Sequence, residues 1–211
     1  MTEYLSSSTK RRLDVASALM VGTGLGLPAL LLAQFVRLDG GPVLFEQTRY
    51  SKGEPFEVLK IRSMYEGAEH DEPMWVGHDD PRATRVGRIL RKTSLDEVPQ
   101  IINVLRGDIS MVGYRPPSER VQDRYSQFGQ LYEEWLEMTK ESKAGITGLA
   151  QQKAKRTPVH DADLCRQVME LDLRYAETAS LALDLQIIAG TAGCMWERDA
   201  MRQSSLVSEG V

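Results

Sequence analysis

Cysteine and histidine are scarce in this sequence. The cysteines are Cys165 and Cys194, and they show neither the spacing of a metal site nor a disulfide framework. The three histidines, His70, His78 and His160, lie in polar stretches, and no metal-ligand spacing links them, so we assign them no role. We expect both cysteines to be free and reduced, which favours a cytosolic setting.

Positive charge is not in excess either. The chain has 26 Lys and Arg against 30 Asp and Glu, a formal net charge of −4, so bulk charge gives no argument for nucleic-acid binding. The negative mean hydropathy argues against a polytopic membrane protein. We find no internal repeat and no low-complexity tract. The remaining composition is that of an ordinary folded protein, and 211 residues suffice for one domain with an appendage.

One long apolar run lies near the N-terminus. Residues 13–36 are nearly all apolar, which is about the length that crosses a bilayer as a helix. Pro28 lies inside the run, where proline removes a hydrogen bond and kinks a helix, and glycines at 22, 24 and 26 weaken the helix just before it. Bases flank the run at 10–12 and at Arg37. The positive-inside tendency would hold both flanks on the cytoplasmic side.

These observations leave two arrangements of the run open. One is a straight span, and the other is a re-entrant helix-break-helix that is interrupted at Pro28 and returns to the same face. A signal peptide is disfavoured, because the run is long and no clear small-x-small cleavage site follows it.

The first half of the remaining chain predicts a small β-hairpin and two short helices. Strands are expected at 43–45 and 56–61, around the polar turn 51–55. Residues 66–82 are polar and are predicted to form a long loop. Helices are expected at 86–92 and at 98–105, the second ended by Arg106-Gly107.

The second half predicts helices. Apolar residues recur at three- and four-residue steps in an amphipathic helix over 118–140. Its apolar stripe either faces the core or lies on a membrane interface, for which Trp and Tyr are suited. Further helices are expected at 164–175 and 181–196, and residues 204–211 are expected to be a disordered tail.

The most informative stretch is Arg91-Lys-Thr-Ser-Leu-Asp-Glu-Val-Pro-Gln100. Ser94 to Glu97 fits an S-x-x-E capping box, with Ser94 as the N-cap. Pro99 fits that register poorly, because its missing N–H falls in the helix ladder. In either register Asp96 is expected at a helix N-terminus, where a carboxylate is stabilised and a phosphate can be held.

The same stretch has a chemical interpretation. An ionised Asp is a competent nucleophile toward phosphorus, and an adjacent carboxylate can help to hold Mg²⁺, which prefers oxygen ligands shared with phosphates. Guanidinium groups pair phosphate oxygens in a bidentate manner. The candidate phosphate clamps are Arg82, Arg85, Arg88, Arg91 and Arg115.

These residues and their surroundings resemble the bacterial sugar transferase family, in its small, monotopic phosphoglycosyl transferase form. The resemblance covers roughly residues 10–191. Its motifs run in order along the chain: Gly41-Pro-Val-Leu-Phe-x-Gln47-x-Arg49, Lys60-x-Arg-Ser-Met64, Asp80-Pro-Arg82-x-Thr84-x-x-Gly87, Thr93-Ser-Leu-Asp-Glu-x-Pro-Gln100, Asn103-Val-Leu-Arg-Gly-Asp108-x-Ser-Met-Val-Gly113-x-Arg115-Pro116, Gly145-Ile-Thr-Gly148-x-Ala-Gln151, Leu171-Asp172 with Tyr175, and Asp184.

The resemblance implies an α+β, mainly helical fold. It implies a re-entrant membrane helix-break-helix over 10–37 with its break at Pro28, a small β-hairpin and amphipathic interface helices. Residues 1–9 would be a flexible N-terminus and 38–203 a cytosolic catalytic domain. The protein would lie on the cytoplasmic face of the bacterial inner membrane. The oligomeric state stays open, a homodimer included.

The resemblance also implies a reaction. A phosphosugar would pass from a UDP-sugar to a polyprenyl phosphate such as undecaprenyl phosphate, with release of UMP, as the first membrane step of glycoconjugate or exopolysaccharide assembly. Asp96 would be the nucleophile of a ping-pong course, and Glu97 its partner in Mg²⁺ binding. The substrate- and phosphate-binding residues implied are Lys60, Arg62, Arg82, Arg91, Arg115 and Lys143.

The chain departs from the family pattern in places. Tyr114 stands where the family commonly has Pro, Lys143-Ala144 where it has Arg-Pro, and Leu149 where it has Trp. Lys143 keeps the charge but loses the bidentate fork of arginine. Two other functional classes remain as alternatives: a membrane-anchored scaffold without turnover, and a single-pass protein with an extracytoplasmic domain. The sequence does not reveal which sugar is transferred.

Overall fold

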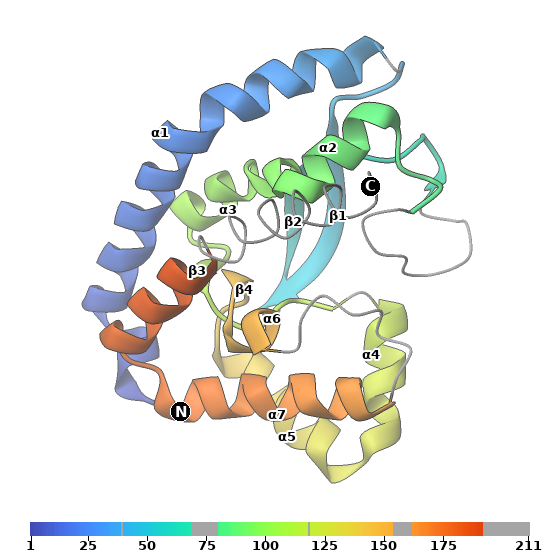
Figure 1. The fold of residues 1–211 in the computed structure, drawn as a ribbon. Helices are drawn as coiled ribbons and strands as arrows, with labels where there is room; N and C mark the ends of the chain where they lie inside the picture. The colour runs from blue at the N-terminus through green and yellow to red at the C-terminus, as the bar shows by residue number, and fades with distance from the viewer. Residues whose placement is uncertain (39, 69–79, 118, 154–161, 192–211) are drawn as a thin grey trace, which may run out of the picture.

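A computed structural model describes residues 1–38, 40–68, 80–117, 119–153 and 162–191 of the chain (Figure 1). The fold is mainly helical with two small sheets, as the predicted α+β class requires. The long helix α1 (Ser8–Leu38) runs along one side of the molecule, and the remaining elements pack beside it. The predicted loop 66–82 lies mostly outside the described residues, as do the histidines, Cys194 and the tail 204–211.

Helix α1 is continuous, with Pro28 inside it. The predicted break into two helices is therefore not formed; instead, the helix bends along its length (Figure 1). A proline removes a single backbone donor and bends a helix without having to end it, and the neighbouring glycines leave room for the bend. Small residues, among them Ala29 and Ala33, face the rest of the protein, while Leu27, Leu30 and Leu31 are exposed.

The N-terminal segment 1–9, expected to be flexible, packs against the rest of the chain. It contains the 3-10 turn η1 (Glu3–Ser6), and the Thr2 N–H donates to the Ala176 carbonyl at 3.1 Å. The Tyr4 hydroxyl donates to Asp184 at 2.9 Å. The sequence carries no local signal for this packing, because both partners lie at the far end of the chain.

The predicted hairpin is confirmed, and its strands are longer than expected. β1 (Leu44–Ser51) pairs antiparallel with β2 (Glu54–Ile61). The two turn residues, Lys52 and Gly53, both have positive φ, as a two-residue type I′ hairpin turn requires.

Two predicted helices are confirmed as α2 (Arg85–Thr93) and α3 (Gln100–Arg106), joined by the single 3-10 turn η3 (Leu95–Glu97). The predicted capping box is wrong: the Ser94 side chain makes no capping bond, and its backbone is left-handed with φ 56°. Ser94 instead closes α2, because its N–H donates to the carbonyls of Leu90 and Arg91. An N-cap needs extended backbone angles, which this position no longer has.

The predicted helix over 118–140 is interrupted. It forms α4 (Glu119–Tyr125), η4 (Ser126–Phe128) and α5 (Gln130–Glu141), which are separated at Gly129 with its positive φ of 54°. Trp135 and Met138 are buried in the main core, which confirms the core-facing alternative for the apolar stripe. The apolar stripe is therefore not available to a membrane interface.

The main core lies among α5, α7 and a short parallel sheet. Strand β3 (Ser110–Val112) pairs with β4 (Gly145–Thr147), which leads into α6 (Leu149–Lys153). Helix α7 (Ala162–Thr178) and a last helix, Leu181–Thr191, confirm the two C-terminal helices as far as they are described. A second, smaller core joins α1, α2, η3 and β2 through Ala33, Leu90, Leu95 and Ile61 respectively.

Candidate active site

Asp96 and Glu97 lie in η3, between α2 and α3. The preceding Leu95 is 8% exposed and belongs to the smaller core. Its burial fixes the turn against α1 and β2, and leaves the two following carboxylates half-buried at the surface. Asp96 is thus in a three-residue turn ahead of α3 and not at the start of a long helix, so the charges around it matter more than a helix dipole.

Two cations from distant parts of the chain meet Glu97. The Arg115 Nη2 atom lies 2.7 Å from the Glu97 Oε1 atom, and the Lys60 Nζ atom lies 3.6 Å from the same oxygen. The side chains are 47% exposed for Arg115, 28% for Lys60 and 13% for Glu97. Water, and therefore a dissolved substrate, can reach this ion cluster.

The electrostatics of the cluster favour a further anion. Burial lowers the pKa of Lys60, Glu97 and Asp96 oppose that shift, and Arg115 and Arg49 add to it. The charge of Glu97 raises the pKa of Arg115. Three cations therefore act against two carboxylates, and a phosphate placed among them would be stabilised. From the sequence alone, Arg49 is a motif residue that is equally consistent with an interface anchor or a solvated surface charge.

Lys60 is positioned by a buried amide, that of Asn103, for which the sequence indicates no role beyond its place in a motif. Asn103, on α3, accepts from the Leu59 N–H at 3.2 Å and donates to the Glu57 carbonyl at 2.8 Å. Its side chain is 0% exposed. The amide satisfies two backbone groups of β2 as a neighbouring strand would, and so fixes β2, with Lys60, against α3.

Arg115 is positioned by Tyr114, one of the residues that depart from the family pattern. Tyr114 is buried and packs edge-on against Trp135, with ring centroids 6.0 Å apart. Its hydroxyl donates to the carbonyls of Tyr50 and Thr139 at 3.3 and 3.4 Å. Arg115 therefore extends from an anchored residue, and its guanidinium reaches Glu97.

Arg82 binds a different carboxylate, Asp80, which also feels the charge of Arg91. Arg82 Nη2 lies 2.8 Å from Asp80 Oδ2, and Arg82 also donates to the Ala68 carbonyl. Burial by itself would raise the pKa of Asp80, but hydrogen bonds from Arg82 and the charge of Arg91 hold it below its usual value. Arg82 thus lies with Asp80 just before the start of α2, whereas Arg91, in the last turn of α2, acts on Asp80 through its charge.

Arg62 and Lys143 are held by backbone carbonyls. Arg62 is 7% exposed and donates to the carbonyls of Val36 and Gly40, which ties the end of α1 to β2. Lys143 donates to the Gly107 carbonyl at 2.6 Å, at the end of α3. Burial and the charge of Arg11 lower the pKa of Lys143. The phosphate-binding roles of both residues stay predictions.

The carboxylates fit a magnesium site that shares its ligands with a substrate. The described residues contain no group of three or more His, Cys, Asp or Glu that could hold a metal ion, so they form no closed protein cage. Mg²⁺ does not need one, because it is commonly bound through one or two carboxylates together with substrate phosphates. Asp96 and Glu97 supply that number of carboxylates.

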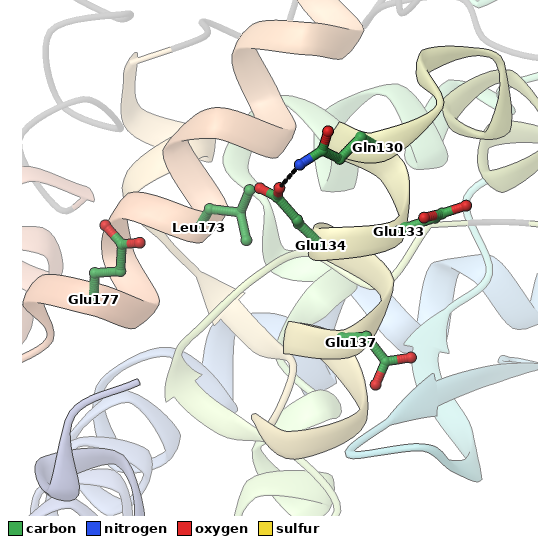
Figure 2. Close-up of a pocket in the computed structure, with 6 residues that line it drawn as sticks. All are labelled: Gln130, Glu133, Glu134, Glu137, Leu173 and Glu177. Atoms are coloured by element: carbon green, nitrogen blue, oxygen red, sulfur yellow. Dashed lines mark hydrogen bonds between the residues drawn. The ribbon is translucent and has the colours of Figure 1, made fainter.

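A separate groove lies between α5 and α7 (Figure 2). It is lined by Gln130, Glu133, Glu134, Glu137, Leu173 and Glu177. The Gln130 amide donates to Glu134 at 2.8 Å, and the remaining polar lining is acidic. Its negative charge would repel phosphate, so the groove is not the site of phosphate chemistry.

Comparison with known proteins gives the family. The model of the bacterial sugar transferase family matches residues 5–198. The UDP-glucose:undecaprenyl-phosphate glucose-1-phosphate transferase of Caulobacter vibrioides is 40% identical over 197 residues, 90% of this chain and 70% of that protein. The Escherichia coli protein of the same name is 37% identical over 85% of this chain. The undecaprenyl-phosphate glucose phosphotransferase of Komagataeibacter xylinus is 38% identical, also over 85%.

These matches cover unequal shares of the relatives. The chain spans 38% of the Escherichia coli protein and 34% of the Komagataeibacter xylinus protein. The matched region nevertheless includes η3, β2 and β3, and with them the residues of the ion cluster. The chain belongs to the bacterial sugar transferase family and is a phosphoglycosyl transferase.

Proposed function

We propose that this protein transfers a phosphosugar from a UDP-sugar to a membrane polyprenyl phosphate, such as undecaprenyl phosphate, and releases UMP. The observation that carries the proposal is the meeting of Asp96-Glu97 with Lys60 and Arg115 at an accessible position. The names of the relatives support the same donor and acceptor classes. The reaction would be the first membrane step of a glycoconjugate or exopolysaccharide.

The proposed course has two displacements at one phosphorus atom. An Asp96 carboxylate oxygen forms a bond to the phosphorus nearer the sugar, and the bond from that phosphorus to the bridging oxygen breaks. UMP leaves with that oxygen and its electron pair. A phosphate oxygen of the polyprenyl phosphate then attacks the same phosphorus, the bond to Asp96 breaks, and the carboxylate is regenerated.

The cations of the cluster stabilise the charge that develops in both displacements. Arg115 offers a planar pair of donors and Lys60 a compact charge, so together they can hold non-bridging phosphate oxygens. Mg²⁺, held by Asp96 and Glu97, would neutralise donor phosphate charge as a Lewis acid. When a phosphate enters, Arg115 and Lys60 exchange part of their contact with Glu97 for contact with the substrate.

For α1 we propose a re-entrant position in the cytoplasmic face of the membrane. The helix is long and apolar enough to span a membrane by composition, but both of its ends contact the same folded domain. Lys10, near its start, donates to the Val112 carbonyl, and Val36, near its end, accepts from Arg62. A straight span would carry these two ends to opposite faces of the bilayer, which supports entry and return on one face.

The neighbouring helices extend the surface that would meet the membrane. Ile89 on α2 and Ile102 on α3 are exposed, although both helices pack against α1. Arg85 and Arg88 lie exposed on α2, where they suit anionic headgroups. These short helices, and not residues 118–140, are the amphipathic interface helices of the proposal.

The function is tested with the full chain in nanodiscs that contain undecaprenyl phosphate and Mg²⁺. A panel of UDP-sugars is assayed for UMP release and for a lipid-linked product. We expect at least one donor to give both products in equal amounts. UMP release without lipid product, or neither product from any donor, would contradict the proposed transfer.

A further inference from the structure

A buried ion cluster lies at the start of α1, away from the carboxylates of the proposed reaction. The Lys10 Nζ atom is 3.2 Å from Asp14 Oδ1 and 2.8 Å from Asp184 Oδ2. All three side chains are at most 4% exposed. Burying one cation between two carboxylates costs desolvation, and apolar residues of similar volume would often stabilise the fold equally well. The cluster therefore calls for a role beyond stability.

The cluster hydrogen-bonds to a backbone carbonyl and to a backbone N–H of strand β3. Lys10 Nζ donates to the Val112 carbonyl at 2.9 Å, and the Met111 N–H donates to Asp14 Oδ1 at 2.9 Å. The Tyr175 hydroxyl adds hydrogen bonds to Asp184 at 2.8 Å and to the Val112 carbonyl at 3.2 Å. A donor and an acceptor are thus matched to one register of the strand, which nonpolar packing would not specify.

Strand β3 leads directly to the proposed site. Three residues after Val112 comes Arg115, whose guanidinium lies 2.7 Å from Glu97. The Gly113 N–H donates to the Thr147 carbonyl at 2.9 Å, so this stretch is held to β4 and has little freedom to adjust. A shift of β3 along α1 would therefore be transmitted to the guanidinium.

We propose that Lys10 is a positioning residue, which couples the membrane helix α1 to the phosphate-binding Arg115 through β3. This inference rests on the proposed function, because it assigns the cluster to the same phosphoryl transfer. The first turn of α1 and the site then move as one body, and Arg115 keeps a fixed place relative to the helix that sets the depth of the enzyme in the membrane.

A double-mutant cycle separates positioning from plain stabilisation. Lys10→Met, Arg115→Lys and the double variant are made in the full chain and assayed in nanodiscs for UMP release, with a donor that the wild type uses. We expect Lys10→Met to lower kcat about tenfold when Arg115 is present, and less than about threefold in the Arg115→Lys background, since residues that act through one another are not additive.

Two further variants complete the design. Tyr175→Phe removes hydrogen bonds to Val112 and Asp184 but leaves every charge in place, so it replaces Lys10→Met if that variant does not fold. Arg11→Met is the matched control: Arg11 is the next residue of α1 and donates to the carbonyls of Val104 and Leu105 on α3, not to β3. We expect its effect to be additive with Arg115→Lys.

The outcomes are distinct. Coupling for Lys10 or Tyr175, with additivity for Arg11, supports the inference. Additive effects throughout, or equal coupling for Arg11, would overturn it, because the cluster would then only stabilise the fold. A wild-type chain that releases no UMP with any donor would overturn the proposed function and the inference with it.

Discussion

The molecule contains two clusters in which carboxylates meet cations, and they differ in exposure. In the candidate site, Arg115 is 47% and Lys60 28% exposed beside Glu97. At the start of α1, Lys10 and Asp184 are 4% and 0% exposed. Accessible ions can exchange a partner for an incoming phosphate, whereas buried ions cannot exchange theirs without a large desolvation cost. The same residue types thus suit phosphoryl transfer in the exposed cluster and the fixing of backbone elements in the buried cluster.

The comparison is sharpened by a carboxyl group outside both clusters, which is buried beside an indole. Asp172 is 3% exposed and accepts a hydrogen bond from the Trp135 indole N–H at 3.1 Å. Burial raises its pKa to about 7, and the indole bond only partly opposes this. Its burial is therefore met by binding a proton below about neutral pH, and not by a cation as in the two clusters.

The largest effect is expected at the accessible cluster. Asp96→Asn removes the proposed nucleophile at nearly constant volume, so we expect UMP release to fall by at least about 10³-fold. Thermal unfolding of the variant should match the wild type, because the half-buried side chain is not part of the core. A variant that retains near-normal UMP release would refute the assignment of Asp96.

The buried cluster should also contribute to stability, besides the positioning role proposed above. Asp184→Ala removes one carboxylate and leaves Lys10, Tyr4 and Tyr175 short of an acceptor. We expect a loss of about 3–5 kcal/mol in the free energy of unfolding, measured by denaturation in detergent micelles.

The matched control for this variant is Glu137→Ala. It breaks the exposed pair with Lys140, whose side chains are 51% and 70% exposed, and should change the free energy of unfolding by less than about 1 kcal/mol. Equal losses in the two variants would remove the distinction between buried and exposed ion pairs in this fold.

Asp172 predicts a pH dependence of stability. Because its pKa is raised in the folded state, the unfolded chain loses this proton at lower pH, so stability falls as pH rises from about 4 to about 7 and levels off above that. Asp172→Asn keeps an acceptor for Trp135 but does not titrate. We expect the fall between pH 5 and pH 7 to be about 2 kcal/mol smaller in the variant. Parallel stability curves for the two proteins would contradict the protonated state.

The smallest effect is expected for Lys60. Burial lowers its pKa, so it loses its charge at a lower pH than an exposed lysine, and the KM for the UDP-sugar should rise several-fold toward alkaline pH. Lys60→Arg should abolish this rise, because arginine stays charged. A KM whose pH profile is the same in both proteins would show that Lys60 does not contact the donor phosphates in its charged form.

Local patterns predicted the elements well where the signal itself is local. The polar turn 51–55 and the C-cap at Gly107 contain glycines, which tolerate positive φ, and the stripe ending at Met138 fits the core-facing one of its two expected arrangements. Predictions were wrong where a residue with positive φ ends a helix that the pattern would continue. Ser94 closes α2 before it can cap a second helix, and Gly129 interrupts the helix expected over 118–140.

The sequence by itself determined the apolar run, the hairpin, the Asp96-Glu97 pair and the family, because each depends on residues close together or in a fixed order. The tertiary structure decided which cations meet the pair. Lys60 comes from β2, and Arg115 comes from the segment that follows β3. Arg62 and Lys143 instead donate hydrogen bonds to backbone carbonyls. It also joined Lys10 to Asp184 across 174 residues. Contacts of this kind depend on how strands and helices register in space, and the periodicity of a sequence does not record that.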